Sequence, residues 1–156
     1  MTRTRLFLIG GVVVAVGSAL LGCALPVSKP SSSPPALQTT ATLSIGGTPV
    51  RVAIADTPAL REHGLSGYAP LEADEGMLFV FPADGRHSFW MKDMLFSIDM
   101  LWLDANGRVV HVEKGVSPAT FPQTFTPSSP SRYVLEVPSG FCDAHGIEVG
   151  DMAIFP

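Results

Sequence analysis

The chain has 156 residues, of which 46% are hydrophobic and 15% are charged, and this length suits one domain better than two. Its 10 basic and 14 acidic residues give a formal net charge of −4. Because there is no basic stripe to hold a phosphate backbone, we expect no nucleic-acid partner. The two cysteines, Cys23 and Cys142, are too few for a disulfide framework, and neither a CxxC nor an HExxH motif occurs.

Residues 1–22 have the features of an export signal. Arg3 and Arg5 precede an apolar run over residues 6–21. At ~1.5 Å per residue this run spans roughly 24 Å, which is short of the ~30 Å hydrocarbon core of a bilayer. A charged start, a short apolar run and small residues after it predict a signal peptide rather than a permanent membrane helix.

Cys23 ends the sequence Leu20-Leu21-Gly22-Cys23, which resembles the signal of bacterial lipoproteins. The resemblance implies that Cys23 becomes the first mature residue and carries the lipid that anchors the protein to a membrane, on its periplasmic side. Ala24 after the cysteine would favour the outer membrane in a Gram-negative host. The alternatives are an ordinary cleaved signal peptide or an uncut anchor, with Cys23 incidental.

Residues 23–40 are rich in proline and serine. Such a composition cannot bury enough apolar surface to offset its ordering entropy, so it predicts a disordered tether. Residues 41–156 would then form one folded head.

The patterns within this head are mostly those of strands. Short apolar or alternating runs predict strands over Thr42–Ile45, Val50–Ala55, Met77–Phe81, Phe89–Met91, Phe96–Leu103, Val109–Glu113, Tyr133–Val137 and Met152–Phe155. Capping residues predict short helices over Pro58–His63 and Ser139–His145, and the proline-rich residues 118–130 read as a long loop. The expected fold is α+β and mainly β: a single antiparallel sheet, curled or barrel-like, with one or two short helices.

Residues 86–94 hold the densest group of side chains that could bind a ligand. In an extended chain alternate side chains share a face, so Trp90 and Lys92 would lie side by side, with Ser88 and Met94. An indole beside a cation suits sugars or small anions. The alternative is a half-buried strand in which Lys92 covers a core tryptophan.

Asp99 is the only charged residue on the strand face that it would share with Leu101 and Leu103. A carboxylate in that position must be paired, hydrogen-bonded or located at a cleft. It could form a structural ion pair with Lys92 or Arg86, or it could act as a catalytic acid.

Metal binding is a weaker prospect. The spacing of Met91, Met94 and Met100 could imitate a cuprous site, but methionine is also a common core residue. The four histidines stand singly, and Cys142 is expected to be a buried free thiol. We therefore expect no metal site and no cofactor.

Four ordered motifs resemble the DUF192 family of small bacterial and archaeal domains. They are Thr57-Pro58 with Arg61, Gly64 and Leu65; EGMLFVF over residues 75–81; FWMK over residues 89–92 with Ile98-Asp99; and YVLEV over residues 133–137 with Gly140 and GIEVGD over residues 146–151. Asp93 stands where the family usually has asparagine. The resemblance implies a compact, β-rich α+β domain without an established activity, and its signature includes Trp90, Lys92 and Asp99.

Three functions follow from these observations. The favoured one is a lipid-anchored envelope protein that binds a small molecule, a glycan or a partner without chemistry, through Arg86, Trp90, Lys92 and Asp99, with residues 118–130 as a rim. The second is an envelope hydrolase or lyase acting on a glycan, with Asp99 as acid or base and a second carboxylate roughly 5–9.5 Å away. The third is a carrier of cuprous ions.

Overall fold

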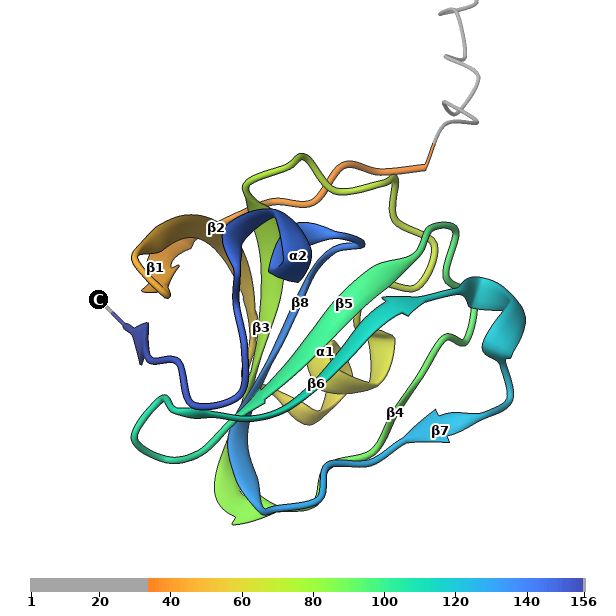
Figure 1. Cartoon of the computed structure of the whole chain (residues 1–156). Helices are drawn as coiled ribbons and strands as arrows, with labels where there is room; N and C mark the ends of the chain where they lie inside the picture. Colours follow the sequence, from red (N-terminus) through yellow and green to blue (C-terminus); the bar gives the residue numbers. More distant parts are fainter. Residues whose placement is uncertain (1–33, 156) are drawn as a thin grey trace, which may run out of the picture. The chain divides into compact units, whose positions relative to one another are not determined.

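The computed structural model describes residues 34–155, which form a curled, mostly β structure (Figure 1). Its strands are β1 (Ala41–Ile45), β2 (Thr48–Ala55), β3 (Glu75–Gly85), β4 (Phe89–Trp90), β5 (Ile98–Leu103), β6 (Val109–Val116), β7 (Thr124–Phe125), β8 (Ser131–Pro138) and β9 (Ala153–Ile154). The helices of this part are α1 (Pro58–His63) and α2 (Phe141–His145), and a 3-10 turn, η1, covers Pro118–Thr120. The predicted α+β, mainly β class is confirmed.

Seven strands form one sheet in the order β6-β5-β8-β3-β2-β1-β9, whereas β4 and β7 pair with each other. One pair of the large sheet differs from the predicted antiparallel arrangement, because β2 and β3 run parallel. The cause is the crossover between them, residues 56–74, which contains α1 and returns the chain to the end of the sheet where β2 began.

Two local predictions are confirmed in detail. β1 and β2 form a hairpin around Gly46 and Gly47, whose φ angles of 55° and 84° are those that a two-residue type I′ turn requires. Helix α1 covers the predicted residues. Its N-cap Thr57 accepts a hydrogen bond from the backbone N–H of Leu60 at 3.2 Å, and Gly64 ends it at a positive φ.

The segment after Trp90 turns sooner than predicted. The backbone N–H of Met94 donates to the carbonyl of Met91, and Asp93 has a φ of 55°. Met94 is therefore buried and Asp93 exposed, so the regular alternation of an extended chain does not continue past Lys92. The predicted loop over residues 118–130 is also more ordered than expected, because it contains η1 and β7, and β7 pairs with β4.

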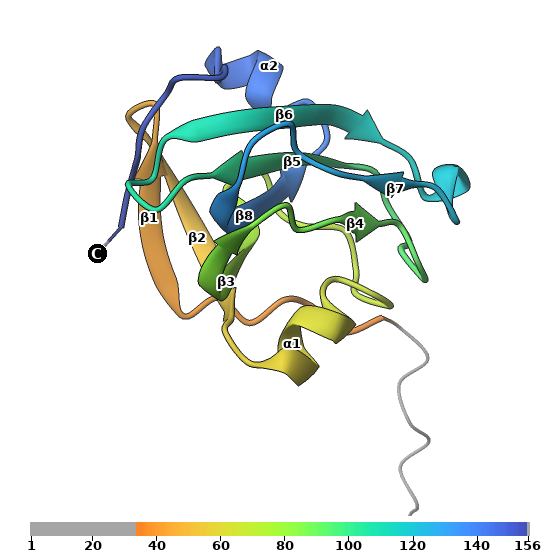
Figure 2. The same cartoon turned by 90° about the horizontal axis from the view of Figure 1, so that it is seen from below.

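The large sheet buries side chains on both faces, with α1 and α2 on opposite sides of it (Figure 2). One face carries Leu101, Leu135 and Val137 and packs on Phe141 of α2. The other face carries Phe79, Trp102 and Val134 and packs on the segments around α1 and β4. Side-chain alternation along the strands directs their buried residues to one or the other of these two cores.

Residues 34–40 belong to the predicted tether, yet they contact the head. Leu37 is buried in the core on the α1 side, and the carbonyl of Pro35 accepts a hydrogen bond from the N–H of Ala69 at 2.9 Å. The predicted signal peptide over residues 1–22, the lipidated Cys23 and the first part of the tether lie outside the described residues. No helix within residues 34–155 is long and apolar enough to cross a membrane.

Candidate ligand-binding site

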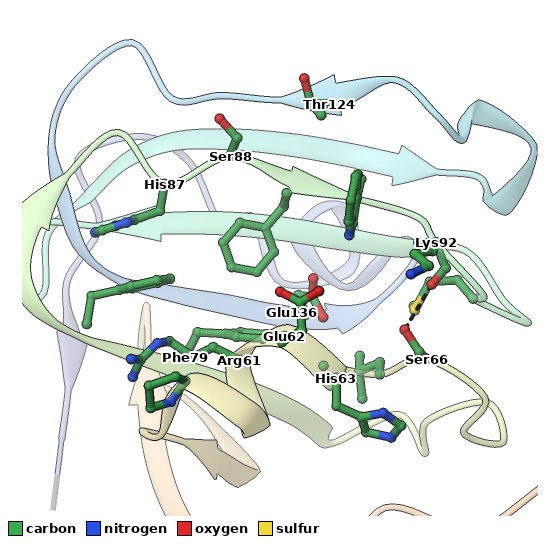
Figure 3. A pocket seen from close by; sticks show the side chains of 17 residues that line it. Arg61, Glu62, His63, Ser66, Phe79, His87, Ser88, Lys92, Thr124 and Glu136 are labelled. Atoms are coloured by element: carbon green, nitrogen blue, oxygen red, sulfur yellow. Dashed lines mark hydrogen bonds between the residues drawn. The ribbon is translucent and has the colours of Figure 1, made fainter.

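A cavity of about 530 Å³ lies between α1 and the strands β3, β4, β7 and β8 (Figure 3). Its wall combines aromatic rings with a few polar groups, as is typical of sites for small molecules. The aromatic side chains are Phe79, Phe81, Phe89 and Trp90; the ionisable ones are Arg61, Glu62, His63, His87, Lys92 and Glu136; and the hydroxyls are those of Ser66, Ser88 and Thr124.

The predicted juxtaposition of Trp90 and Lys92 is present at this cavity. The Lys92 Nζ lies 5.9 Å from the centroid of the Trp90 ring, which is within reach of a cation–π interaction. Trp90 is 46% exposed, so it is not the core tryptophan of the alternative interpretation; Trp102, with 0% exposure, has that place. Among residues 34–155, no carboxylate lies within 4 Å of the Lys92 ammonium.

The position of Trp90 follows from the strand that carries it. In β4 the preceding Phe89 packs edge-on against Phe79, with ring centroids 4.8 Å apart, so the next side chain points away from the core. The turn after β4 is tied to the loop after α1, because the Ser66 hydroxyl donates to the carbonyl of Lys92 at 2.9 Å. The Phe121 ring lies 5.9 Å from that of Trp90, and so the 118–130 segment borders the site.

Arg61 of α1 is held in place at another part of the cavity. Its guanidinium donates to the carbonyls of Asp56, at 2.5 Å, and of Val80, at 2.8 Å, and lies 5.2 Å from the centre of the Phe81 ring. Phe81 in turn stacks on His87, with ring centroids 3.5 Å apart. On this side of the cavity, the Arg61 guanidinium therefore lies over the Phe81 ring, which stacks on His87, and these contacts hold all three side chains in place.

Glu136 is an acid on the same wall and the most unusual residue of the site. It lies in β8 between Met77 of β3 and Met100 of β5, and it is 4% exposed. Every fully enclosed side-chain nitrogen or oxygen of the described residues has a hydrogen-bond partner. No side chain or backbone group of residues 34–155 forms a hydrogen bond with the Glu136 carboxyl. Its oxygens are therefore not fully enclosed, and they open onto the cavity that Glu136 lines (Figure 3).

Burial changes the acidity of this carboxyl. Removal of water disfavours the charged form, and it raises the pKa of Glu136 from 4.5 to about 8. A carboxyl that changes its charge near neutral pH and faces a cavity can accept a proton, donate one, or pair with a cation. Glu136 is the single charged residue in the apolar run YVLEV, and this pattern could have marked it as a buried acid. Glu136 was not among the predicted site residues.

Asp99 lies elsewhere, and the expected ion pair with Lys92 or Arg86 does not occur in the described part of the chain. Alternation along β5 places Asp99 on the face that packs on α2, away from the cavity. Its carboxylate is fully buried and accepts hydrogen bonds from the backbone N–H groups of Gly115 at 2.8 Å, Gly140 at 3.2 Å and Cys142 at 3.0 Å. These bonds fix the start of α2, a structural role that leaves Asp99 without access to a ligand.

Arg86, Met91 and Met100 lie apart from the cavity, whereas Met94 is one of the residues that line it. Arg86 is exposed and does not line the cavity. Met91, Met94 and Met100 are buried in the core on the α1 side, and no cluster of three or more His, Cys, Asp or Glu side chains suited to a metal occurs within residues 34–155. Cys142 is a buried free thiol, as expected, and burial next to Asp99 raises its pKa to about 12.

Several known proteins are similar to this chain. A UPF0127 protein of Thermococcus gammatolerans is 34% identical over 103 residues, and one of Thermococcus kodakarensis is 33% identical over 104 residues. Each alignment covers 65% of this chain, which spans 63% and 62% of the two relatives, a little under two thirds of their length.

Two crystal structures share the fold, both with a TM-score of 0.71. One is a protein of unknown function from Novosphingobium aromaticivorans, 25% identical and covering 94% of this chain and 100% of its own. The other, from Sinorhizobium meliloti, is named as a candidate transcription regulator; it is 24% identical and covers 76% of this chain and 96% of its own.

The model of the DUF192 family, described as Uncharacterized ACR, matches residues 41–155. This match covers all the strands and both α-helices of the described structure, including every residue that lines the cavity. The chain belongs to the DUF192 family.

Proposed function

We propose that this chain is an exported lipoprotein of the cell envelope, anchored at Cys23, whose DUF192 domain binds a small ligand in the cavity beside α1. The support for the anchor is the charged and apolar start of the chain and the Leu20-Leu21-Gly22-Cys23 sequence. The proline- and serine-rich residues that follow suit a spacer between a membrane and a binding domain.

One observation carries the binding function: a cavity of about 530 Å³ whose wall contains an exposed Trp90 beside Lys92 and a buried Glu136 without a protein partner in the described residues. Sites for small molecules commonly measure roughly 300–1,000 Å³. Within residues 34–155 neither the Lys92 ammonium nor the Glu136 carboxyl forms an ion pair, so these groups do not stabilise the fold in that way. The exposed indole of Trp90 and these groups provide the stacking surface and polar anchors that a small ligand, such as a glycan fragment, requires.

The name of the Sinorhizobium meliloti protein is not transferred to this chain. A formal net charge of −4 and an acid within the cavity oppose the binding of a phosphate backbone.

The test is a thermal-shift screen of the full chain against sugars, amino acids and amines, repeated with Trp90→Ala. Trp90→Ala should abolish the shift produced by any binder and should leave the melting temperature of the free protein nearly unchanged. Leu95→Ala is the matched control, because Leu95 is 55% exposed on the same turn and does not line the cavity. If Trp90→Ala unfolds the domain, or if it leaves the binding unchanged, the proposed site is wrong.

The enzyme alternative now depends on Glu136 instead of Asp99. A carboxyl with a pKa of about 8 in a cleft is suited to general acid catalysis, and Glu62 of α1 is a second carboxylate on the same cavity. Incubation of the full chain with peptidoglycan fragments, followed by mass spectrometry of the products, tests this alternative. A cleavage that is lost in Glu136→Gln would support it.

A further inference from the structure

The Glu136 carboxyl is the only ionisable group deep in the cavity wall of the described structure, since the other ionisable lining residues are exposed or half-buried. Its neighbours across the sheet are Met77 and Met100, and neither side chain can donate a strong hydrogen bond. A buried carboxylate is costly unless a cation or several donors compensate it. Within residues 34–155 nothing does, so the free protein holds this carboxyl in its protonated form up to a pKa of about 8, and a cation that stabilises the ionised form has to come from outside the described residues.

The two cations of the cavity do not reach this carboxyl. The guanidinium of Arg61 is engaged by two backbone carbonyls and a phenylalanine ring, and the ammonium of Lys92 lies beside the indole of Trp90. Neither forms an ion pair with Glu136, and Figure 3 shows the Glu136 carboxyl between them in that view. Neither Arg61 nor Lys92 therefore neutralises the Glu136 carboxyl.

Aromatic rings line the cavity onto which the acid opens. Phe79, Phe81, Phe89 and Trp90 all line the cavity, and Phe89 packs edge-on against Phe79 and Phe81. The negative faces of such rings attract an organic cation, and the attraction is stronger where water is excluded. A neutral hydroxyl could donate a hydrogen bond to the acid, but it would lack both the ion pair with the carboxylate and the attraction of a cation to the ring faces.

We propose that the ligand of this cavity is a small organic amine, which places its ammonium group against the Glu136 carboxylate and its apolar body against the aromatic wall. This inference rests on the proposed binding function and specifies the chemical class of the ligand. Lys92 and Arg61, at the more exposed part of the wall, would then face the end of the ligand that remains near solvent.

The proposal predicts a pH dependence of binding. An amine pairs with the ionised carboxyl, so binding releases a proton while the pH is below the pKa of Glu136, about 8. The apparent affinity should rise roughly five- to tenfold between pH 7.0 and pH 8.5. The other titratable groups that face this space are Arg61, Glu62 and His63 from α1, and His87 and Lys92 from the segments around β4.

The experiment uses three probes that share a phenyl ring and differ in charge: phenethylamine, 2-phenylethanol and 3-phenylpropionate. The full chain is labelled at its two tryptophans, and the indole signals of Trp90 and Trp102 are followed by NMR during each titration. Phenethylamine should shift the Trp90 signal and bind at least about tenfold more tightly than 2-phenylethanol at pH 8.5. In Glu136→Gln the two probes should bind equally, because the charge that separates them is gone while the shape of the cavity is kept.

Glu148→Gln is the matched control, because Glu148 is exposed and does not line the cavity, and it should leave the preference for the amine unchanged. The inference is overturned if the alcohol or the carboxylate binds as tightly as the amine, or if Glu136→Gln preserves the preference. These results would still leave a ligand-binding cavity. Failure of all three probes to move the Trp90 signal would count against the binding function itself.

Discussion

Replacement of Glu136 by Gln should stabilise the protein, and the gain should grow with pH. Below pH 4.5 the Glu136 carboxyl is protonated in the folded and the unfolded chain, and it contributes no pH dependence. Between pH 4.5 and about 8 the folded chain keeps a proton that the unfolded chain has lost, so the stability of the wild type falls as the pH rises. Glutamine has nearly the same shape and does not titrate.

The size of the effect follows from the two pKa values. Each unit of difference corresponds to about 1.4 kcal/mol. The variant should therefore gain about 3 kcal/mol over the wild type between pH 4.5 and pH 7, and about 5 kcal/mol once the pH exceeds 8. Domains of this size unfold with roughly 5–15 kcal/mol, so the difference is easily measured.

Urea unfolding of both full chains at pH 5, 6, 7, 8 and 9, at constant ionic strength, gives this difference directly. Other titrating groups affect both chains alike and cancel. A difference that stays constant across this range would show that the Glu136 carboxyl is ionised in the folded protein, and the account of its burial would then be wrong.

Four further predictions concern other residues. Cys23→Ala should abolish the incorporation of labelled palmitate when the chain is produced in a bacterium, whereas Cys142→Ala should not. Asp99→Ala should lower the free energy of unfolding by at least about 3 kcal/mol, measured in urea, because three backbone N–H groups lose their acceptor. The Cys142 thiol, with a pKa of about 12 and no exposure, should react with Ellman's reagent only after unfolding. Asp93→Gly should be neutral or stabilising and Asp93→Val should cost about 1–2 kcal/mol, because position 93 has a positive φ; melting temperatures distinguish the two.

The sequence predicts correctly those elements whose bounds are set by residues close together in the chain. Helix α1 was predicted to the residue because its cap, its first-turn proline and its terminal glycine are all neighbours in the sequence. The β1–β2 hairpin was predicted for the same reason, from Gly46-Gly47. The direction of β3 relative to β2 depends instead on how the chain crosses over, and the pairing of β4 with β7 joins residues 89–90 to 124–125. Neither the parallel direction of β3 nor the β4–β7 pairing can be recognised from a short stretch of neighbouring residues.

The candidate site was predicted only in part. Trp90 and Lys92 were found because both stand in one short segment, and they do line one cavity. Arg86 was included by its nearness in sequence, yet its side chain does not reach the cavity. Arg61 and Glu136 come from α1 and β8, and only the fold brings them to the same cavity as Trp90.

The two buried acids show why the sequence favoured Asp99, which lies away from the cavity, over Glu136, which lines it. Asp99 and Glu136 each stand alone in an apolar strand, and the strands β5 and β8 are adjacent in the sheet, so their local patterns are equivalent. What separates them is the face of the sheet on which each lies. Asp99 meets the backbone N–H groups of Gly115 and Gly140, where positive φ angles turn the chain toward it, and these donors compensate its burial. Glu136 meets methionines and open space, so nothing in residues 34–155 compensates the burial of its ionised form; the amine ligand that we propose would supply that partner.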